Sequence, residues 1–190
     1  EMANACKHIS NLKFPKYYSE LSSEKILTMD WMEGEHLSEF TSHNINREKG
    51  DKLGQALWDF YMFQMHELRQ VHADPHPGNF LVDKDANLMP IDFGCIKKVP
   101  EDFYIPYFEL ANPVFLNDPK LFRKKLFQLE ILREDDSKTE IEYFTALFHK
   151  LLSLFTRPFH VDHFDFSDED FFGAIATMGE EFTKDTQLRK

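Results

Sequence analysis

The side chains best suited to chemistry lie in one short stretch, VHADPHPGNFLVDKDANLMPIDFG. Asp74 follows His72 after one residue, Asn79 follows Asp74 after four more, and Asp92 comes near the end of the stretch. Phosphoryl transfer needs a carboxylate near the attacking hydroxyl and oxygen ligands that hold Mg²⁺ against the phosphates. We therefore predict a phosphoryl-transfer site with Asp74 as the catalytic base and Asn79 and Asp92 as magnesium ligands.

Two short apolar runs must position these groups. Phe80–Val82 and Leu88–Ile91 are predicted to be strands, joined by the turn Asp83–Asn87. A hairpin brings the residue before its first strand and the residue after its second strand to the same end. Asn79 and Asp92 should therefore meet there, with Asp74 across from them.

The sequence before this stretch predicts a strand pair and a long helix. Two strand-like runs occupy Lys13–Met32 and are separated by Ser22–Ser23. Apolar residues at helical spacing predict a helix over about residues 47–70. A two-stranded hairpin is marginal in water, so the pair at Lys13–Met32 needs a further surface to pack against.

The sequence after residue 100 predicts helices. CIKKVPEDF, after Gly94, is expected to lead directly into the first of them. Three further helix starts are marked by Asp118 before Pro119, by Ser137 with Glu140, and by Ser167. Apolar residues follow the last two at helical spacing, among them Phe155 and Phe172, and we expect them in the core. The fold class is therefore α+β and mostly helical.

Composition narrows the function classes. A net charge of −11 argues against a nucleic-acid surface, which would be basic. The two cysteines, Cys6 and Cys95, cannot build a disulfide framework, so a reducing compartment is expected. The chain carries no apolar run of transmembrane length and no secretory signal. Because it begins with Glu1 rather than Met, we expect a processed protein or a piece of a longer one.

Three segments resemble the UbiB/AarF family of atypical, protein-kinase-like kinases: HADPHPGNFLV…IDFG, KILTMDWMEGEHL and EMANACKHISNLKFPKYY. The resemblance covers about residues 1–100, with only a general likeness to a helical kinase C-lobe beyond. It implies the roles already given to Asp74, Asn79 and Asp92. It also implies that His72 is a structural histidine packed under the catalytic loop.

The resemblance further implies a nucleotide site. Met29 matches the gatekeeper position, and Asp30 and Met32 match the hinge, where backbone groups bond the adenine. Leu81 matches the residue that floors the adenine pocket. The implied cofactors are ATP and Mg²⁺.

The implied organisation is a remnant of the kinase N-lobe at 1–32 and a kinase C-lobe at 33–190. The implied function is phosphoryl transfer or ATP hydrolysis linked to isoprenoid-quinone (ubiquinone-type) biosynthesis. The expected partners are the missing N-lobe, from the same gene or a neighbouring gene, and a small-molecule or lipid-pathway substrate. No nucleic acid is expected. We expect a cytoplasmic protein, either free or peripheral at the inner membrane in a quinone-synthesis complex.

Departures from kinase patterns keep two alternatives open. Ala73 replaces the arginine that pairs with a phosphorylated activation loop in ordinary protein kinases. The family's alanine-rich nucleotide loop, phosphate-clamping lysine and K-x-G-Q element are absent from the chain. One alternative is a small-molecule kinase of the aminoglycoside or choline kinase type, although Phe93-Gly94 is unlike the residues that usually follow its metal aspartate. The other is an inactive kinase-like interaction module.

Overall fold

The computed structural model describes residues 2–43 and 45–184, so Glu1 lies outside the described residues. The chain divides into two compact units, one ending at Pro100 and the other beginning at Glu101. The predicted division into kinase lobes, at 1–32 and 33–190, has a different boundary from that between these two units and stays a prediction. Among the described residues, no helix combines the length and apolar character needed to cross a bilayer.

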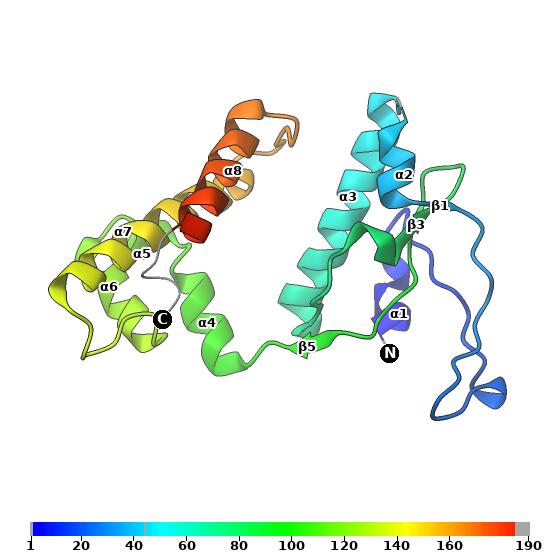
Figure 1. Cartoon of the computed structure of the whole chain (residues 1–190), viewed down its shortest axis with the longest axis horizontal. Helices are drawn as coiled ribbons and strands as arrows, with labels where there is room; N and C mark the ends of the chain where they lie inside the picture. The colour runs from blue at the N-terminus through cyan, green and yellow to red at the C-terminus, as the bar shows by residue number, and fades with distance from the viewer. Residues whose placement is uncertain (1, 44, 185–190) are drawn as a thin grey trace. The chain divides into compact units, whose positions relative to one another are not determined.

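The first unit combines helices with two small antiparallel sheets (Figure 1). One sheet has the strand order β1-β3-β4 and the other pairs β2 with β5. The elements are α1 (Met2–Ala5), η1 (Cys6–His8), η2 (Ser19–Leu21), β1 (Glu35–His36), α2 (Leu37–Ser42), α3 (Arg47–Phe63), η3 (Gln64–Leu68), β2 (Gln70–His72), η4 (Pro77–Asn79), β3 (Phe80–Val82), β4 (Leu88–Pro90) and β5 (Ile96–Lys98).

Helix α3 supplies the main core face of this unit. The Asn46 side chain caps it by accepting a hydrogen bond from the Lys49 N–H at 2.9 Å. Leu53, Ala56 and Phe60 are buried on one face, at the spacing of a helix packed against a core. The predicted helix is confirmed over residues 47–63. Its predicted last turns instead form a π-helical turn, and residue 70 belongs to β2.

The core of the first unit lies between α3, the β3–β4 hairpin and the N-terminal segment. Phe60, Phe80 and Leu88 are almost completely buried there. The N-terminal segment runs along β4, because Lys13 N–H donates to the Leu88 carbonyl at 2.9 Å and Leu88 N–H donates to the Asn11 carbonyl at 2.8 Å. The predicted strands at 80–82 and 88–90 are confirmed.

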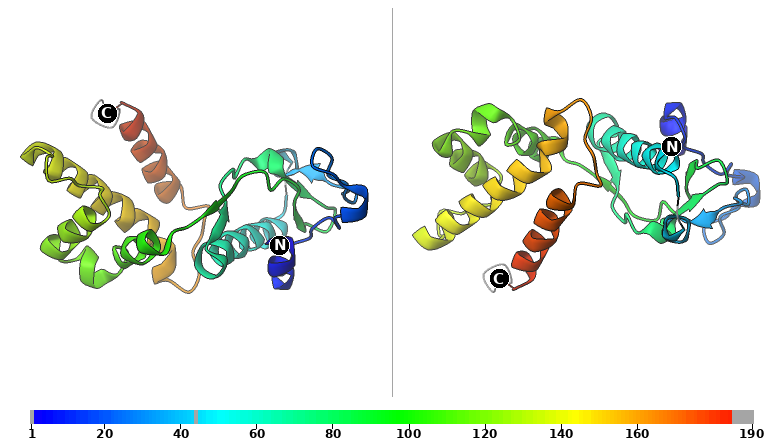
Figure 2. Two further views of the ribbon diagram at one scale, coloured as in Figure 1. Left: turned by 90° about the horizontal axis from the view of Figure 1, so that it is seen from below. Right: turned by 90° about the horizontal axis from the view of Figure 1, so that it is seen from above.

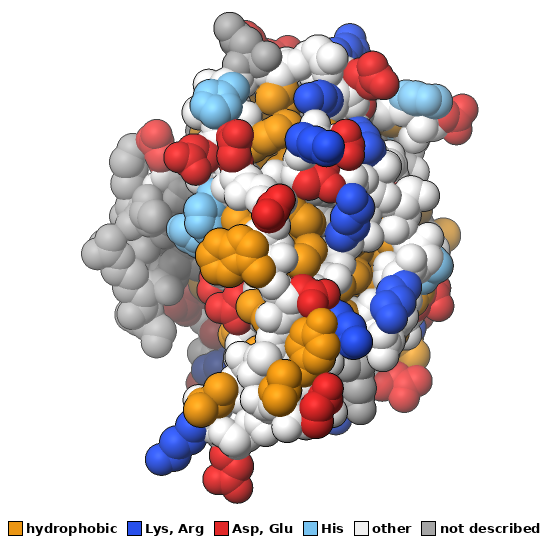
Figure 3. All heavy atoms as spheres, turned by 90° about the vertical axis from the view of Figure 1, so that its right-hand side faces the viewer, with side chains coloured by type: hydrophobic (Ala, Val, Ile, Leu, Met, Phe, Trp, Pro, Cys, Tyr) orange, Lys and Arg blue, Asp and Glu red, His pale blue; other side chains and the backbone are white. Residues whose placement is uncertain are grey.

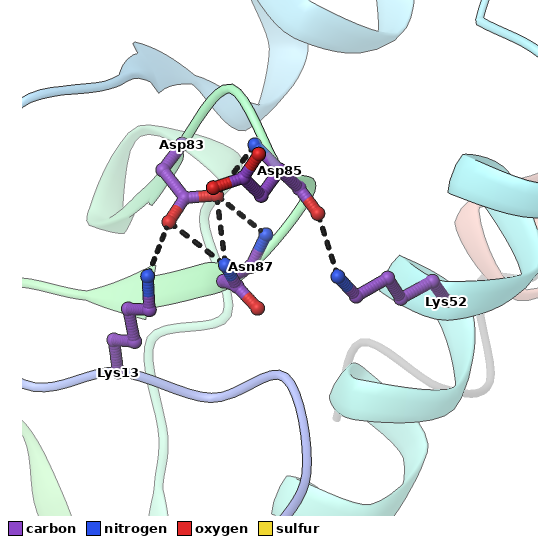
Figure 4. Close-up of polar contacts among 5 residues, drawn as sticks. All are labelled: Lys13, Lys52, Asp83, Asp85 and Asn87. Atoms are coloured by element: carbon purple, nitrogen blue, oxygen red, sulfur yellow. Dashed lines mark hydrogen bonds and ion pairs between the residues drawn. The ribbon is translucent and has the colours of Figure 1, made fainter.

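The turn between β3 and β4 is tied to two other parts of the unit (Figure 4). One carboxylate oxygen of Asp83 accepts hydrogen bonds from the backbone N–H groups of Asp85 and Asn87, at 3.0 and 2.9 Å. The other forms an ion pair with Lys13 at 2.7 Å. Lys52 of α3 donates to the Asp85 carbonyl at 2.6 Å. The turn therefore links the hairpin to both the N-terminal segment and α3.

The prediction of two regular strands at Lys13–Met32 is wrong. The segment turns back on itself, with bridges at Tyr17–Met29 and Ser23–Ile26, but forms no continuous strands. Hydroxyl groups interrupt the pairing: the Thr28 N–H donates to Ser22 Oγ, and Thr28 Oγ1 donates to the Leu21 carbonyl. Such side-chain bonds compete with a backbone ladder. We call residues 16–30 the irregular hairpin.

The second unit is helical (Figure 2). Its core contains Leu110, Phe122, Leu126, Leu132 and Leu152, all buried. The helices are α4 (Glu101–Glu109), α5 (Pro113–Leu116), α6 (Pro119–Gln128), α7 (Lys138–Phe155), the short η5 (Arg157–His160) and α8 (Glu169–Lys184).

Two of the three predicted helix starts are confirmed. Asp118 caps α6, with Pro119 at its first position, and Ser137 with Glu140 forms a capping box at α7. The third is displaced, because Asp168 rather than Ser167 accepts the first N–H groups of α8, those of Asp170 and Phe171.

Two further expectations fail beyond Gly94. Phe155 and Phe172 are about half exposed, at 47% and 51%, and do not join the core. CIKKVPEDF does not lead directly into helix, because Ile96–Lys98 forms β5 before α4 begins at Glu101. The reason is that β2 offers a pairing partner for this segment.

Candidate active site

Strands β2 and β5 bring the Asp74 loop beside the Asp92 segment. They pair antiparallel, with Val71 opposite Lys97. The pairing continues one residue further, where the Ala73 N–H donates to the Cys95 carbonyl at 2.8 Å. Asp74 follows immediately on one side, and Asp92 lies three residues before Cys95 on the other. No pattern in the sequence predicts this pairing, which fixes the start of the predicted catalytic loop.

The β3–β4 hairpin places Asn79 and Asp92 at one end, as the sequence predicts. Leu81 pairs with Met89, and beyond the strands the Ile91 N–H donates to the Asn79 carbonyl at 3.0 Å. Asp92 is the next residue after Ile91. The two strand pairs therefore deliver Asp74, Asn79 and Asp92 to the same end of the first unit.

Asn79 and Asp74 are in direct contact. The Asn79 amide nitrogen donates to the Asp74 carbonyl and to Asp74 Oδ2, both at 3.0 Å. These bonds commit the nitrogen of Asn79, so Oδ1 is the atom of this side chain that could coordinate a cation. The Asp74 carboxylate is exposed and is held in place by its neighbour.

Asp92 is exposed and shaped by a tight local turn. Its Oδ1 accepts a hydrogen bond from the Gly94 N–H at 2.7 Å. A Cβ atom at Gly94 would lie 3.1 Å from that same oxygen, so glycine suits the turn. Asp92 Oδ2 is the second oxygen of this carboxylate and could coordinate a cation.

Two tyrosines that the sequence argument did not assign to the site lie near its carboxylates. Burial, and then the negative charge of Asp92, raise the pKa of Tyr17. Burial, and then the charge of Asp74, raise the pKa of Tyr61 to about 12. Both hydroxyls are therefore protonated at neutral pH. The only sequence signal for Tyr61 was its place on the apolar face of α3, which indicated a core residue.

His72 lies beneath the loop and is 2% exposed. Its ring packs near Phe80 and Phe93, with centroid distances of 6.2 and 5.9 Å. Its Nδ1 is 3.5 Å from the Tyr61 hydroxyl. This burial agrees with the structural role predicted for His72 and leaves Asp74 as the exposed carboxylate of the loop.

His76 shapes the loop between Asp74 and Asn79. Its Nδ1 accepts a hydrogen bond from the Gly78 N–H at 3.0 Å and caps the turn η4. Because a Cβ atom at Gly78 would lie 2.9 Å from this nitrogen, the ring closely covers the glycine.

The residues predicted to meet the adenine fall into two groups. Met29 and Asp30 lie at the neck of the irregular hairpin, where the Asp30 N–H donates to the Lys16 carbonyl at 2.9 Å. The Asp30 carboxylate accepts bonds from the Tyr18 hydroxyl at 2.8 Å and the Lys16 N–H at 3.1 Å, and these two bonds lower its pKa. Its side chain therefore stabilises the hairpin neck.

Met32 and Leu81 are brought toward the same sheet. Met32 leads into β1, whose His36 pairs with Leu81 of β3. Between them Gly34 approaches the hairpin so closely that a Cβ atom there would lie 2.6 Å from Met89 Cε and 2.7 Å from the Val82 carbonyl oxygen.

The donor atoms at the shared end fit a hard cation. Carboxylate and amide oxygens, as in Asp92 and Asn79, are the ligands that Mg²⁺ prefers. The described residues contain no cluster of three or more His, Cys, Asp or Glu side chains arranged to hold a metal by themselves. Mg²⁺ would therefore need oxygens from water and from the phosphates as well, which is its usual mode of binding in kinase sites.

Comparison with known proteins points to a kinase-like family. The model of the ABC1 atypical kinase-like domain matches residues 1–126. AarF domain-containing protein kinase 1 of Xenopus laevis is 30% identical over 128 residues, which cover 65% of this chain and 25% of that protein. The probable serine/threonine-protein kinase abkB of Dictyostelium discoideum is 34% identical over 120 residues, which cover 57% and 17%.

A plant relative matches over a similar length. Protein ACTIVITY OF BC1 COMPLEX KINASE 7, chloroplastic, of Arabidopsis thaliana is 26% identical over 130 residues, which cover 67% of this chain and 18% of that protein. The chain thus spans about a quarter or less of the length of these relatives. The match reaches residue 126, beyond the predicted limit near residue 100, and this chain belongs to the ABC1 (AarF) family of atypical kinase-like domains.

Proposed function

We propose that this chain is the C-lobe portion of an ABC1-type kinase or ATPase that binds Mg-ATP. The observation that carries the proposal is the pair of bonds from the Asn79 amide to Asp74, at the end of the hairpin where Asp92 follows. Asp74 acts as the base that accepts the proton of the attacking hydroxyl. Asn79 and Asp92 hold Mg²⁺, which supplies positive charge to the phosphates.

The role proposed for each side chain follows from the hydrogen bonds that its atoms already make. Asn79 uses its nitrogen to fix the Asp74 carboxylate and retains an oxygen for the cation. Asp92 uses one oxygen for the Gly94 N–H and retains the other. Positioning of this kind supplies most of the catalysis in phosphoryl transfer, because the protein performs little covalent chemistry itself.

The proposal places the adenine between the hinge and the β1-β3-β4 sheet. Backbone groups of Asp30 and Met32 bond the base, Met29 is the gatekeeper, and Leu81 floors the pocket. The support is that Met32 leads into β1 and that β1 pairs with the strand that carries Leu81.

The exposed apolar side chains of the irregular hairpin and of the residue after it offer a surface against which an N-lobe would pack. Leu21, Ile26 and Leu27 are each more than 60% exposed, and Trp31 is 89% exposed. Figure 3 looks onto the side of the molecule that carries this hairpin and shows large apolar side chains at the surface. A sheet laid against them would bury this apolar area and would supply the surface that a lone hairpin lacks.

The reaction that we propose is phosphoryl transfer or ATP hydrolysis linked to isoprenoid-quinone biosynthesis. The relatives named as kinases support a kinase-like transferase. The link to quinone synthesis, with a small-molecule or lipid-pathway acceptor, is proposed from the family resemblance.

The test measures binding of Mg-ATP by calorimetry, to the chain alone and with the separately expressed region that precedes the matching segment in the Xenopus laevis relative. We expect Mg²⁺-dependent binding, strengthened by the added region and weakened by about tenfold or more in Asp92→Asn. Asp85→Asn is the matched control, because Asp85 is exposed in the β3–β4 turn, at the other end of the same hairpin.

Three results would contradict the proposal. Absence of Mg-ATP binding with the added region in place would favour an inactive interaction module. Equal binding by wild type and Asp92→Asn would remove Asp92 from the metal site. Phosphorylation of an added aminoglycoside or amino-alcohol would favour the small-molecule kinase.

A further inference from the structure

The connection between α3 and the catalytic loop contains an irregular turn. After Phe63 the helix widens into the π-helical turn η3, and Arg69 ends it in the left-handed region with φ 54°. Strand β2 begins at the next residue. Such π-helical turns are rare and frequently lie at functional sites. The turn directly precedes the strand that leads to Asp74.

The first residue of this turn, Gln64, is fully buried and makes two hydrogen bonds with its side chain. Its Nε2 donates to the Phe60 carbonyl at 3.1 Å. Its Oε1 accepts from the backbone N–H of His72 at 2.7 Å. The side chain therefore uses one donor and one acceptor, which a neutral amide provides and a hydrocarbon does not.

The register of β2 explains why His72 needs this partner. In antiparallel pairs, residues exchange backbone hydrogen bonds at every second position. The Val99 N–H donates to Arg69 and the Ala73 N–H donates to Cys95, so the bonded positions on this side are 69, 71 and 73. The N–H of His72 consequently faces away from β5, and Gln64 supplies its acceptor.

We propose that Gln64 is a positioning residue, which substitutes for a missing neighbouring strand and fixes the backbone two residues before Asp74. Without the amide, the buried N–H of His72 and the carbonyl of Phe60 both lose a partner, and the loop is anchored by β5 on one side only. That this anchor matters for nucleotide binding rests on the proposed function of Asp74. The hydrogen bond from His72 to Gln64 does not depend on that function.

The test uses two variants at Gln64 and one control in the full chain. Gln64→Met removes both hydrogen bonds at similar volume. Gln64→Glu retains the acceptor and, when protonated, also the donor to Phe60. Gln55→Met is the control, because Gln55 is an exposed residue of α3 whose side-chain amide donates to Asp59, one helical turn further on, at 2.8 Å.

The first readout is amide hydrogen exchange by NMR, with Ala73 as internal reference because its N–H is bonded to Cys95. In wild type the His72 N–H should be protected. In Gln64→Met its protection relative to Ala73 should fall by about tenfold or more, as expected for loss of a buried hydrogen-bond partner. Gln64→Glu at mildly acidic pH should restore it, and Gln55→Met should leave it unchanged.

Several outcomes would overturn the proposal. One is an unprotected His72 N–H in wild type, which is decisive even if neither variant folds. Another is unchanged relative protection in folded Gln64→Met, or lost protection in folded Gln64→Glu at acidic pH. The second readout, Mg-ATP affinity, separates the two proposals: altered exchange with no nucleotide binding in wild type would retain the anchor and reject the kinase site.

Discussion

Replacing Asp83 by asparagine should weaken the first unit, because this carboxylate holds the β3–β4 turn together and joins it to Lys13. It accepts backbone bonds from Asp85 and Asn87, receives the Asn87 side-chain amide at 2.9 and 3.0 Å, and pairs with Lys13 at 2.7 Å. The Asp83 side chain is 13% exposed and that of Lys13 is 52% exposed. Asparagine keeps one acceptor oxygen and places an amide nitrogen where the second oxygen was.

The size of the expected loss in stability follows from how exposed these two side chains are. The Lys13 side chain is half in solvent, so its ion pair contributes less than the hydrogen bonds within the turn. The hydrogen bonds within the turn lose their charge assistance, which costs about 1 kcal/mol in total. We expect Asp83→Asn to lower the free energy of unfolding by about 1–2 kcal/mol at neutral pH.

The pH dependence has a definite sign. Hydrogen bonds from Lys13 and the turn outweigh burial and hold the pKa of Asp83 well below its usual value in the folded state. A lowered pKa contributes stability that is fully present above the unfolded-state value of about 3.9 and is lost as the pH falls toward the folded-state value. The wild type should therefore lose stability in acid more steeply than Asp83→Asn, which has no carboxyl at this position.

The assay is urea unfolding followed by tryptophan fluorescence at several pH values between neutral and strongly acidic. Both tryptophans, Trp31 and Trp58, lie in the first unit. Asp85→Asn is the control, because no hydrogen bond of the described turn uses the Asp85 carboxylate. The reasoning would be refuted if the free energy of unfolding fell equally steeply with acid in wild type and in Asp83→Asn. It would also be refuted if Asp85→Asn lost as much stability as Asp83→Asn.

Three further predictions concern other parts of the chain. In urea unfolding, Gly34→Ala should lower the free energy of unfolding by about 1–3 kcal/mol, because its Cβ atom would lie 2.7 Å from the Val82 carbonyl oxygen. Gly54→Ala has no atom within 4 Å of its Cβ and should instead stabilise α3 by about 1 kcal/mol. Tyr61→Phe should lose less stability than wild type as the pH rises from 10 to 12, because burial raises the folded-state pKa of Tyr61 from its ordinary value of 10.0 to about 12; an equal loss of stability with rising pH in the two proteins would contradict this. Ser137→Ala should lower the stability of the second unit, followed by far-UV circular dichroism, by about 1 kcal/mol through loss of its capping box, and an unchanged midpoint would show that the cap is replaced by water.

The predicted hairpin and helix caps depend on neighbours in the chain. The β3–β4 hairpin is encoded by two apolar runs and a turn of five residues, and this pattern is enough to predict that Asn79 and Asp92 lie at one end. The Asp118 and Ser137 caps are equally local, because each bonds N–H groups two or three residues ahead. The last helix was predicted to begin at Ser167 rather than after Asp168, because both residue types cap helices and local sequence does not separate them.

Residue types at short spacing were thus enough to indicate the family and the hairpin that brings Asn79 and Asp92 to one end, while the roles of these residues stay predictions. The pairing of β2 with β5 and the Gln64 bond to His72 became evident only from the three-dimensional structure. These contacts join residues whose own patterns are too short or too polar to indicate a partner. They form because backbone groups in the strand that leads to Asp74, such as the N–H of buried His72, must find hydrogen-bond partners wherever the fold provides them.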